Sequence, residues 1–371
     1  MNDAKHLWTI ADICNATNGL TNDHAEATKA DSVITGISID SRETKAGDLF
    51  VALPGTVSDG HKFLAKAQSA GASVALVSKI DRGLNLPQIH VNDCLQALCQ
   101  LGVAGRARFG GIQFGITGSV GKTGSKEMLR HALSQFGSCY ASQRSFNNHI
   151  GVPISLASLP QNTEFAVQEM GMSAAGEIAE LTNLTRPQIA LITRIAESHS
   201  AFFKSTADIA AAKAEIFQAI EGLSIAILNR DDAFYETLHA AAIAAGARRV
   251  ISFGHHHEAA YRLVSIASHD TGMTIEACLA GTDFVFELRM HGRHLAENAM
   301  GVLACVAAAG LPTDKAALAL VDCQPPKGRG QRRRGIYNNC KITIIDDSYN
   351  ASPTSMAAAF NSLAATPPHI M

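Results

Sequence analysis

The sequence is short of several features that would place a protein in a special class. Its 371 residues include one tryptophan, 6% aromatic residues and 17% charged residues, and the formal net charge is only −2. A nearly neutral chain gives no reason to expect a nucleic acid or an anionic membrane as a partner. No run of 18 or more apolar residues occurs, so the sequence predicts no membrane-spanning helix.

The eight cysteines form no C-x-x-C pair, and Cys94 and Cys99 are the closest two. In a chain of this length, scattered cysteines are typical of reduced thiols inside the cell. The opening stretch MNDAKHLWTI lacks the basic region and the long apolar core of a signal peptide. We therefore expect a cytoplasmic protein, and we expect it to be a monomer.

What the sequence does contain is a regular alternation of strands and helices. Residues 1–95 read as a small α/β unit, with short apolar strands at Gly47–Leu53 and Ser73–Val77. From residue 110, buried strands recur with helical segments between several of them. They are expected at Phe114–Thr117, Phe165–Met170, Ile189–Thr193, Ile225–Leu228 and Arg249–Phe253. This spacing predicts a parallel sheet covered by helices on both faces.

The last part of the chain looks different. A helical stretch, Glu297–Gly310, leads to the Pro-, Gly- and Arg-rich segment Gln324–Gly335, which we interpret as a solvated hinge because it lacks the aromatics of an RNA-binding segment. A strand from Lys341 then begins another α/β unit that the sequence leaves incomplete. We expect three domains, 1–95, 96–325 and 326–371, with the residues beyond 335 docked loosely since so short a unit buries little apolar surface.

The stretch GITGSVGKTGSKEM, Gly115–Met128, predicts a phosphate site. A buried strand feeds a glycine-rich turn and then a helix, and the N–H groups at a helix start stabilise an anion. Lys122 would reach the outer phosphates, and the Thr123 hydroxyl would bind Mg²⁺. The strict pattern requires glycine at Ile116, so a glycine turn with an incidental lysine is the alternative. The helix is expected to continue to Gly137.

Further chemical groups follow the ends of the predicted strands, where ligands gather in an open parallel sheet. Glu169 ends one strand and His199 follows the next, while Lys213 lies on the helix after it. Taken singly, each also fits a capping or solvated role. The triplet His255–His257 invites a metal assignment, but consecutive histidines cannot all face one ion, and a surface loop is the preferred interpretation.

Several motifs, in this order, resemble those of the Mur ligases. They are GITGSVGKT, SFNNHIGVPISL, EMGMSAAGEIAEL, SH at 198–199, AKAEIF, LNRDD, GRHLAENA and IDDSYNASPTSM, and the segment 40–77 is similar to the UDP-sugar-binding domain of that family. The resemblance implies an N-terminal UDP-binding α/β domain, a central P-loop parallel-sheet ATPase domain and a truncated Rossmann-like C-terminal domain. Within the family, the motif wording favours the members that join D-alanyl-D-alanine to UDP-N-acetylmuramoyl-tripeptide.

The resemblance also implies an activity and a set of site residues. The family forms an amide bond through an acyl phosphate, with ATP and Mg²⁺, in peptidoglycan precursor synthesis. It implies ATP contacts at Thr117, Gly118, Ser119, Gly121, Lys122, Thr123, Asn298, Asp347, Tyr349 and Asn350, and Mg²⁺ ligands at Thr123, Glu169, His199 and Lys213. It implies catalytic roles for Lys122, His199 and Lys213, the last as a carbamate, and substrate contacts at Ser41, Arg42, Asn147 and Asn148.

Two alternatives stay open at the level of sequence. One is a sister ligase that adds the third residue of the peptide. The other is a truncated, non-catalytic remnant that binds a nucleotide or UDP-sugar, which departures from the family pattern favour. These departures are Ser173 and Ala174 after the GM motif, Arg194, Leu295 and Gly124.

Overall fold

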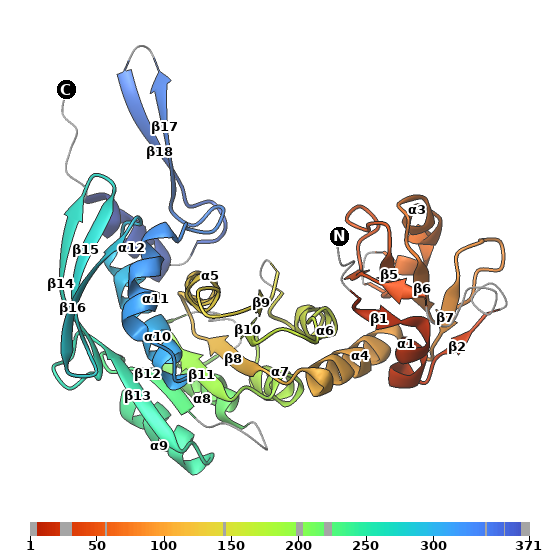
Figure 1. Cartoon of the computed structure of the whole chain (residues 1–371), viewed down its shortest axis with the longest axis horizontal. Helices are drawn as coiled ribbons and strands as arrows, with labels where there is room; N and C mark the ends of the chain where they lie inside the picture. Colours follow the sequence, from red (N-terminus) through yellow and green to blue (C-terminus); the bar gives the residue numbers. More distant parts are fainter. Residues whose placement is uncertain are drawn as a thin grey trace. The chain divides into compact units, whose positions relative to one another are not determined.

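The computed structural model describes residues 6–22, 32–55, 58–143, 146–197, 203–218, 225–337, 340–351 and 353–364. By the density of its internal contacts the chain divides into two compact units (Figure 1). The first consists of Met1–Gly111 and Phe146–Thr163, and the second of Ile112–Ser145 and Glu164–Met371. Within the described residues, no helix has both the length and the hydropathy needed to cross a bilayer.

The first unit is built around a five-stranded sheet with the order β2-β7-β6-β5-β4, in which only the β2–β7 pair is antiparallel. Its strands and helices are β1 (Trp8–Thr9), α1 (Ile10–Thr17), β2 (Leu20–Thr21), β3 (Val33–Ile34), β4 (Gly36–Ser38), β5 (Asp48–Val51), η1 (Gly60–Phe63), α3 (Leu64–Ser69), β6 (Val74–Val77), β7 (Gln88–His90), α4 (Cys94–Arg108) and α6 (Gly151–Ala157). All four residues of β5 and of β6 are buried, as expected for strands covered on both faces.

Side chains fix how the helices of this unit begin and pack. Thr9 and Asp12 form a reciprocal cap at the start of α1, and the Asp93 carboxylate accepts from two backbone amides at the start of α4. The indole of Trp8 donates to the Ala157 carbonyl at 2.7 Å, joining β1 to the end of α6. Because α4 packs on α1 and α6, it groups with the N-terminal sheet, whereas the expected boundary fell at residue 95. The boundaries of the ligand-binding domains stay a prediction.

The second unit contains a nine-stranded sheet with the order β16-β15-β14-β13-β12-β11-β8-β10-β9. Its strands are β8 (Ile112–Thr117), β9 (Cys139–Ala141), β10 (Phe165–Glu169), β11 (Ile189–Ile192), β12 (Ile225–Asn229), β13 (Arg249–Gly254), β14 (Tyr261–His269), β15 (Gly272–Leu279) and β16 (Thr282–Leu288). The pairs from β9 to β14 are parallel, which confirms the expected α/β class with a parallel-sheet centre. Strands β14 to β16 form an antiparallel extension that we did not expect. Along β15 buried residues alternate with more exposed ones. Such a strand contains no continuous apolar run, and continuous runs were the basis on which strands were predicted.

Helices cover the sheet in two groups (Figure 1). They are α5 (Lys122–Leu133), α7 (Glu177–Thr185), α8 (Thr206–Ala214), η2 (Glu215–Phe217), α9 (Tyr235–Ala244), α10 (Arg293–Ala308), α11 (Thr313–Ala319) and η3 (Leu320–Asp322). Helix α10 contacts both α5 and α11, while α8 contacts both α7 and α9. Helix α5 ends at Leu133, four residues before the expected Gly137, because the amides of Gln135 and Phe136 bond to carbonyls three residues back, those of Ala132 and Leu133, and no longer four residues back.

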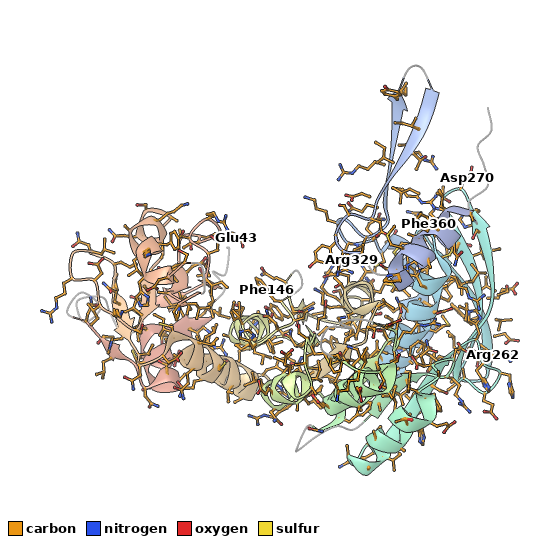
Figure 2. The ribbon with its side chains drawn as sticks, turned by 180° about the vertical axis from the view of Figure 1, so that it is seen from behind. Glu43, Phe146, Arg262, Asp270, Arg329 and Phe360 are labelled. Carbon is orange, nitrogen blue, oxygen red and sulfur yellow. The ribbon has the colours of Figure 1, made fainter. Side chains whose placement is uncertain are left out.

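The segment interpreted as a hinge is partly a strand. Residues Gln331–Tyr337 form β17, which pairs antiparallel with β18 (Cys340–Asp346), and helix α12 (Pro353–Ala364) follows. The hinge interpretation is therefore wrong for the second half of Gln324–Gly335. The arginines of β17 do not alternate with apolar residues, so the local sequence gives no strand signal. The strand forms because it pairs with β18, which lies further along the chain. Figure 2 shows Phe360 on α12, and its side chain is 62% exposed.

Candidate functional site

The glycine-rich turn lies at the carboxyl end of β8, the strand where the order of the sheet reverses. From β8 the chain runs to β9 and β10 on one side and then crosses to β11 on the other side, and such a point is where open α/β sheets bind ligands. Gly118 and Gly121 have φ of 150° and 87°, a region that side chains rarely adopt. A Cβ on Gly118 would lie 2.0 Å from the hydroxyl oxygen of Thr193, so only glycine lets this turn approach the neighbouring loop.

The loop after β11 holds the glycine-rich turn in shape. The backbone amide of Ser119 donates to the Arg194 carbonyl at 2.7 Å, and its hydroxyl donates to the Ala196 carbonyl at 2.8 Å. Thr193 donates from its hydroxyl to the Val120 carbonyl at 2.6 Å. Asp232, at the end of the next strand, accepts from the Ile195 amide at 2.7 Å. The acidic residue after β12 therefore anchors the loop that supports the turn.

Lys122 lies folded back over the turn. Its Nζ donates to the carbonyls of Gly118 and Ser119, at 2.7 and 3.4 Å. Burial lowers the pKa of Lys122, the Glu169 carboxylate opposes that shift, and the charge of Arg329 adds to it. An ammonium held only by two backbone carbonyls of the glycine-rich turn could exchange them for an anionic ligand, which it would bind more strongly.

Thr123 and Glu169 meet beside this turn. The Thr123 hydroxyl, in the first turn of α5, donates to Oε2 of Glu169 at 2.9 Å, and Glu169 ends β10 with 1% of its surface exposed. A hydroxyl and a carboxylate are oxygen donors of the kind that Mg²⁺ prefers. The residues present therefore fit the Mg²⁺ that the family resemblance implies.

Lys213 lies near the end of α8 and is 2% exposed. Burial lowers its pKa well below the usual value, and the charge of Lys122 lowers it further. Two residues later, the Glu215 carboxylate accepts from the backbone amides of Gly176 and Ala179, which fixes the end of α8 against the start of α7. His199 lies outside the described residues.

Asn298, on α10, is 8% exposed and lies against the turn. A Cβ on Gly121 would lie 2.9 Å from the amide nitrogen of Asn298. Of the C-terminal residues, Tyr349 lies near the turn. The Arg329 guanidinium stacks over the Tyr349 ring at 4.2 Å, and Arg329 is close enough to Lys122 for its charge to lower the pKa of that lysine. Asp347 and Asn350 are exposed.

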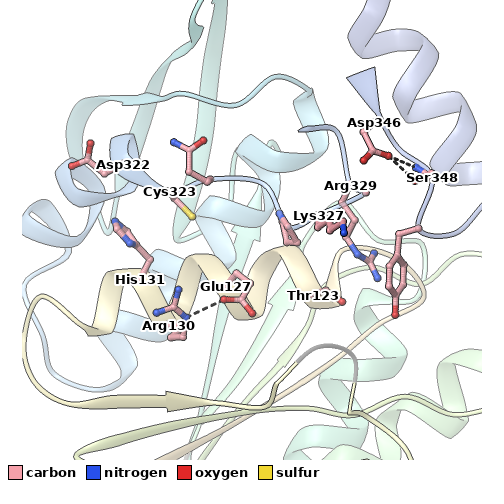
Figure 3. A pocket seen from close by; sticks show the side chains of 14 residues that line it. Thr123, Glu127, Arg130, His131, Asp322, Cys323, Lys327, Arg329, Asp346 and Ser348 are labelled. Atoms are coloured by element: carbon pink, nitrogen blue, oxygen red, sulfur yellow. Dashed lines mark hydrogen bonds and ion pairs between the residues drawn. The ribbon is translucent and has the colours of Figure 1, made fainter. Parts of the chain in front are cut away.

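A cavity of about 700 Å³ runs along α5 from Thr123 to His131 (Figure 3). Its opposite wall comes from the segment after η3 and from the end of β18, including Lys327, Arg329 and Tyr349. Lys327 and Arg329 lie at the same end of the cavity as Thr123 (Figure 3). The cavity is therefore continuous with the glycine-rich turn, and its wall includes Arg329, a residue that the sequence analysis missed.

Four expected substrate residues belong to the first unit. Ser41 is buried, and Arg42 pairs with the Asp40 carboxylate at 2.6 Å, which lowers the Asp40 pKa to about 2. The side-chain oxygen of Asn148 accepts from the Gly151 amide at 2.8 Å, so this residue also caps the start of α6. Asn147 is partly exposed beside it.

The histidine triplet lies in an exposed turn after β13. Ligand atoms of His256, His257 and Glu258 lie within 4.8 Å of one another. The two rings are stacked at 4.4 Å, so their nitrogens lie in roughly parallel planes, and the Glu258 carboxylate already accepts from Arg230 at 3.0 Å. We keep the interpretation of a surface loop.

Sequence reasoning also missed Lys126, which is fully buried one helical turn after Lys122. Its position gave a signal, since Lys126, Leu129 and Leu133 share one face of α5 and the two leucines are core residues. A lysine within an apolar stripe must find polar partners inside the protein, which solvated lysines do not need.

Comparisons with known proteins identify the family of this chain. The description "Mur ligase middle domain" matches residues 116–306, and "Mur ligase family, catalytic domain" matches residues 33–102. The UDP-N-acetylmuramoyl-tripeptide–D-alanyl-D-alanine ligase of Rickettsia prowazekii is 35% identical over 332 residues, covering 89% of this chain and 73% of its own length.

Solved structures show the same relationship. A crystal structure of MurF from Acinetobacter baumannii superimposes with a TM-score of 0.83 at 30% identity, over 96% of this chain and 76% of that one. MurF ligase from Thermotoga maritima, in complex with ADP, gives a TM-score of 0.73 at 25% identity, over 90% and 75% of the two chains. The sequence, the sheet order and the glycine-rich turn thus lead to one conclusion: this chain belongs to the Mur ligase family.

Proposed function

We propose that the chain is an ATP-dependent ligase that adds D-alanyl-D-alanine to UDP-N-acetylmuramoyl-tripeptide in peptidoglycan precursor synthesis. The R. prowazekii relative carries this activity in its name, and the matched structures are MurF proteins. We place the reaction in the cytoplasm, where it serves cell-wall growth, cell shape and division. All seven cysteines whose side chains the structure describes are free, in keeping with a reducing compartment.

One observation carries the proposal: Thr123 and Glu169 are in contact beside Lys122 at the switch point of the sheet. A glycine-rich turn, a lysine and two oxygen donors lie together there, which supports the assignment of a phosphate site. We assign the turn from Thr117 to Thr123 to the ATP phosphates, and Thr123 and Glu169 to Mg²⁺, with His199 as a further proposed ligand. When bound, the metal would neutralise phosphate charge.

The residues of this site are suited to the formation of an acyl phosphate. A carboxylate is a poor electrophile, so the tripeptide carboxylate must first become an acyl phosphate before the amine of D-alanyl-D-alanine can attack it. Two anions must therefore approach one another, and Lys122 would neutralise part of that charge while the rigid turn orients the phosphate. The reaction also requires that water be kept from the acyl phosphate, because water would hydrolyse it.

We assign Lys213 a carbamate. Only a neutral amine attacks CO₂, forming a C–N bond and releasing one proton, and the lowered pKa of Lys213 favours the neutral form. The product would be an anionic oxygen donor in place of a cation. This suits a metal site better than an ammonium does.

We assign the remaining residues by location. The cavity along α5, with Asn298, Arg329 and Tyr349 near its phosphate end, would hold the nucleoside part of ATP, with Asp347 and Asn350 closing on it. The segment 1–95 would bind the UDP portion through Ser41, Arg42, Asn147 and Asn148, the last two reaching it from the chain segment after β9. We expect the enzyme to act as a monomer.

The test is ADP release by the purified chain with ATP, Mg²⁺ and the UDP-linked tripeptide. We expect release only when D-alanyl-D-alanine is added, and an amide product detectable by mass spectrometry. Release instead with UDP-N-acetylmuramoyl-dipeptide and a single amino acid would favour the sister activity. Nucleotide binding without product under either condition would favour a non-catalytic remnant.

A further inference from the structure

We infer that Lys126 is a positioning residue for the metal carboxylate Glu169, an inference that rests on the proposed Mg²⁺ site. Lys126 has none of its surface exposed, although it carries an ammonium group. Its Nζ donates to the backbone carbonyl of Ser142 at 2.6 Å and lies 3.2 Å from a carboxylate oxygen of Glu127. The residue therefore ties α5 to the end of β9.

Ser142 passes this constraint on to Glu169. The Ser142 hydroxyl accepts from the backbone amide of Glu169 at 3.4 Å, and the Ser142 amide donates to the carbonyl of Val167 at 3.1 Å. Ser142 is itself 1% exposed, so it has little room to move. Any shift of the Ser142 backbone would move the acceptor that lies under the Glu169 amide.

The contacts close into a ring. Thr123 and Lys126 are three residues apart on α5 and so lie on the same side of the helix. Thr123 binds the Glu169 carboxylate, Glu169 binds Ser142 through its amide, and Ser142 binds Lys126 through its carbonyl. The ring fixes the Glu169 carboxylate relative to the hydroxyl of Thr123, which are the two proposed oxygen ligands.

Stability alone gives a poor reason for a lysine at this position. Moving an ammonium out of water is costly, and replacing a buried charged group by an apolar one of similar volume is often neutral or stabilising. A methionine has nearly the same length as a lysine and would continue the apolar stripe of α5. The lysine is better explained by the geometry it imposes, since groups that hold metal ligands in place commonly set metal affinity.

The experiment separates this role from a purely structural one. ADP is titrated calorimetrically into the parent and into Lys126→Met, first without divalent ions and then across a Mg²⁺ series. We expect the metal-free ADP affinity to change by less than about twofold and the half-saturating Mg²⁺ concentration to rise about tenfold. The melting temperature should stay equal or rise. Equal half-saturating Mg²⁺ concentrations in parent and variant would overturn the inference.

Two further variants serve as a control and as a second test. Lys315 also donates from Nζ to a backbone carbonyl, that of Gln135 at 2.9 Å. Gln135 follows the last residue of α5, whereas Thr123 is in the first turn, so Lys315→Met should leave the Mg²⁺ dependence unchanged. Ser142→Ala removes only the acceptor for Glu169 and should raise the half-saturating Mg²⁺ concentration about threefold. If Lys126→Met does not fold, Ser142→Ala decides, and a normal Mg²⁺ dependence in it overturns the inference. A parent whose ADP affinity ignores Mg²⁺ overturns the metal site itself, and the inference with it.

Discussion

Lys213 lies buried in α8 so near Lys122 that the charge of one lowers the pKa of the other. Two ammonium groups in one water-poor site repel each other, and the more deeply buried of the two loses its proton more easily. The Nζ of Lys122 keeps two carbonyl partners, whereas among the described residues the Nζ of Lys213 has no hydrogen-bond acceptor. Lys213 is therefore the one of the two amines that is more readily neutral, and a neutral amine can act as a nucleophile.

Lys213→Arg should abolish amide formation, at some cost in stability because arginine places a permanent charge at a site that is 2% exposed. Arginine keeps a positive charge but cannot form the carbamate, so the proposed oxygen donor is lost. The measurement is product formation, together with the ¹³C carbamate signal after incubation with labelled bicarbonate. A variant as active as the parent would mean that Lys213 is an ordinary helix residue.

Lys213→Met should raise the free energy of unfolding near neutral pH. In the unfolded chain the lysine keeps its usual pKa of 10.5, whereas folding lowers it, so the unfolded state binds more protons between the two values. The parent's stability therefore rises with pH across that window, and the advantage of methionine should shrink toward about pH 10.5. Urea titrations in CO₂-free buffer at several pH values check this, and a constant difference would contradict it.

Lys122→Ala should weaken ATP binding by roughly ten- to a hundredfold, the equivalent of about 1.5–3 kcal/mol for a charge-assisted contact. The melting temperature should change little, because the partners of the Lys122 Nζ among the described residues are carbonyls of its own turn. Calorimetric titration with ATP measures the effect. Unchanged affinity would remove the assignment of the turn to phosphate.

Gly118→Ala should destabilise the protein by about 3 kcal/mol or more, since the strain of φ at 150° adds to an overlap with the Thr193 hydroxyl. Gly246→Ala is the matched control. Gly246 also has positive φ, at 89°, but a Cβ there meets open space, so only about 1 kcal/mol of strain is expected. Denaturant titration of both variants gives the comparison, and equal losses would show that the contact with Thr193 does not restrict the turn.

Features that depend on residues adjacent in the chain could be predicted from the sequence alone. Apolar runs such as Ile189–Ile192 predicted the parallel strands, and the glycines before Lys122 predicted the turn at the start of α5, because strand burial and helix starts depend on the local sequence. The ordered motifs gave the family. The antiparallel strands β14–β16 and the strand β17 escaped, because their signals are weak alternation and pairing with a distant partner.

Contacts between side chains that lie far apart in the sequence could not be predicted and are known from the folded structure. Nothing near Lys126 in the sequence identifies Ser142 as its partner, and nothing near Tyr349 identifies Arg329, since both contacts arise from chain segments that return to the same place. Burial likewise belongs to the folded chain: Lys213 reads as a solvated helix lysine until the surrounding elements pack over it and remove its water. The chemistry of a buried amine is therefore set by its neighbours in space.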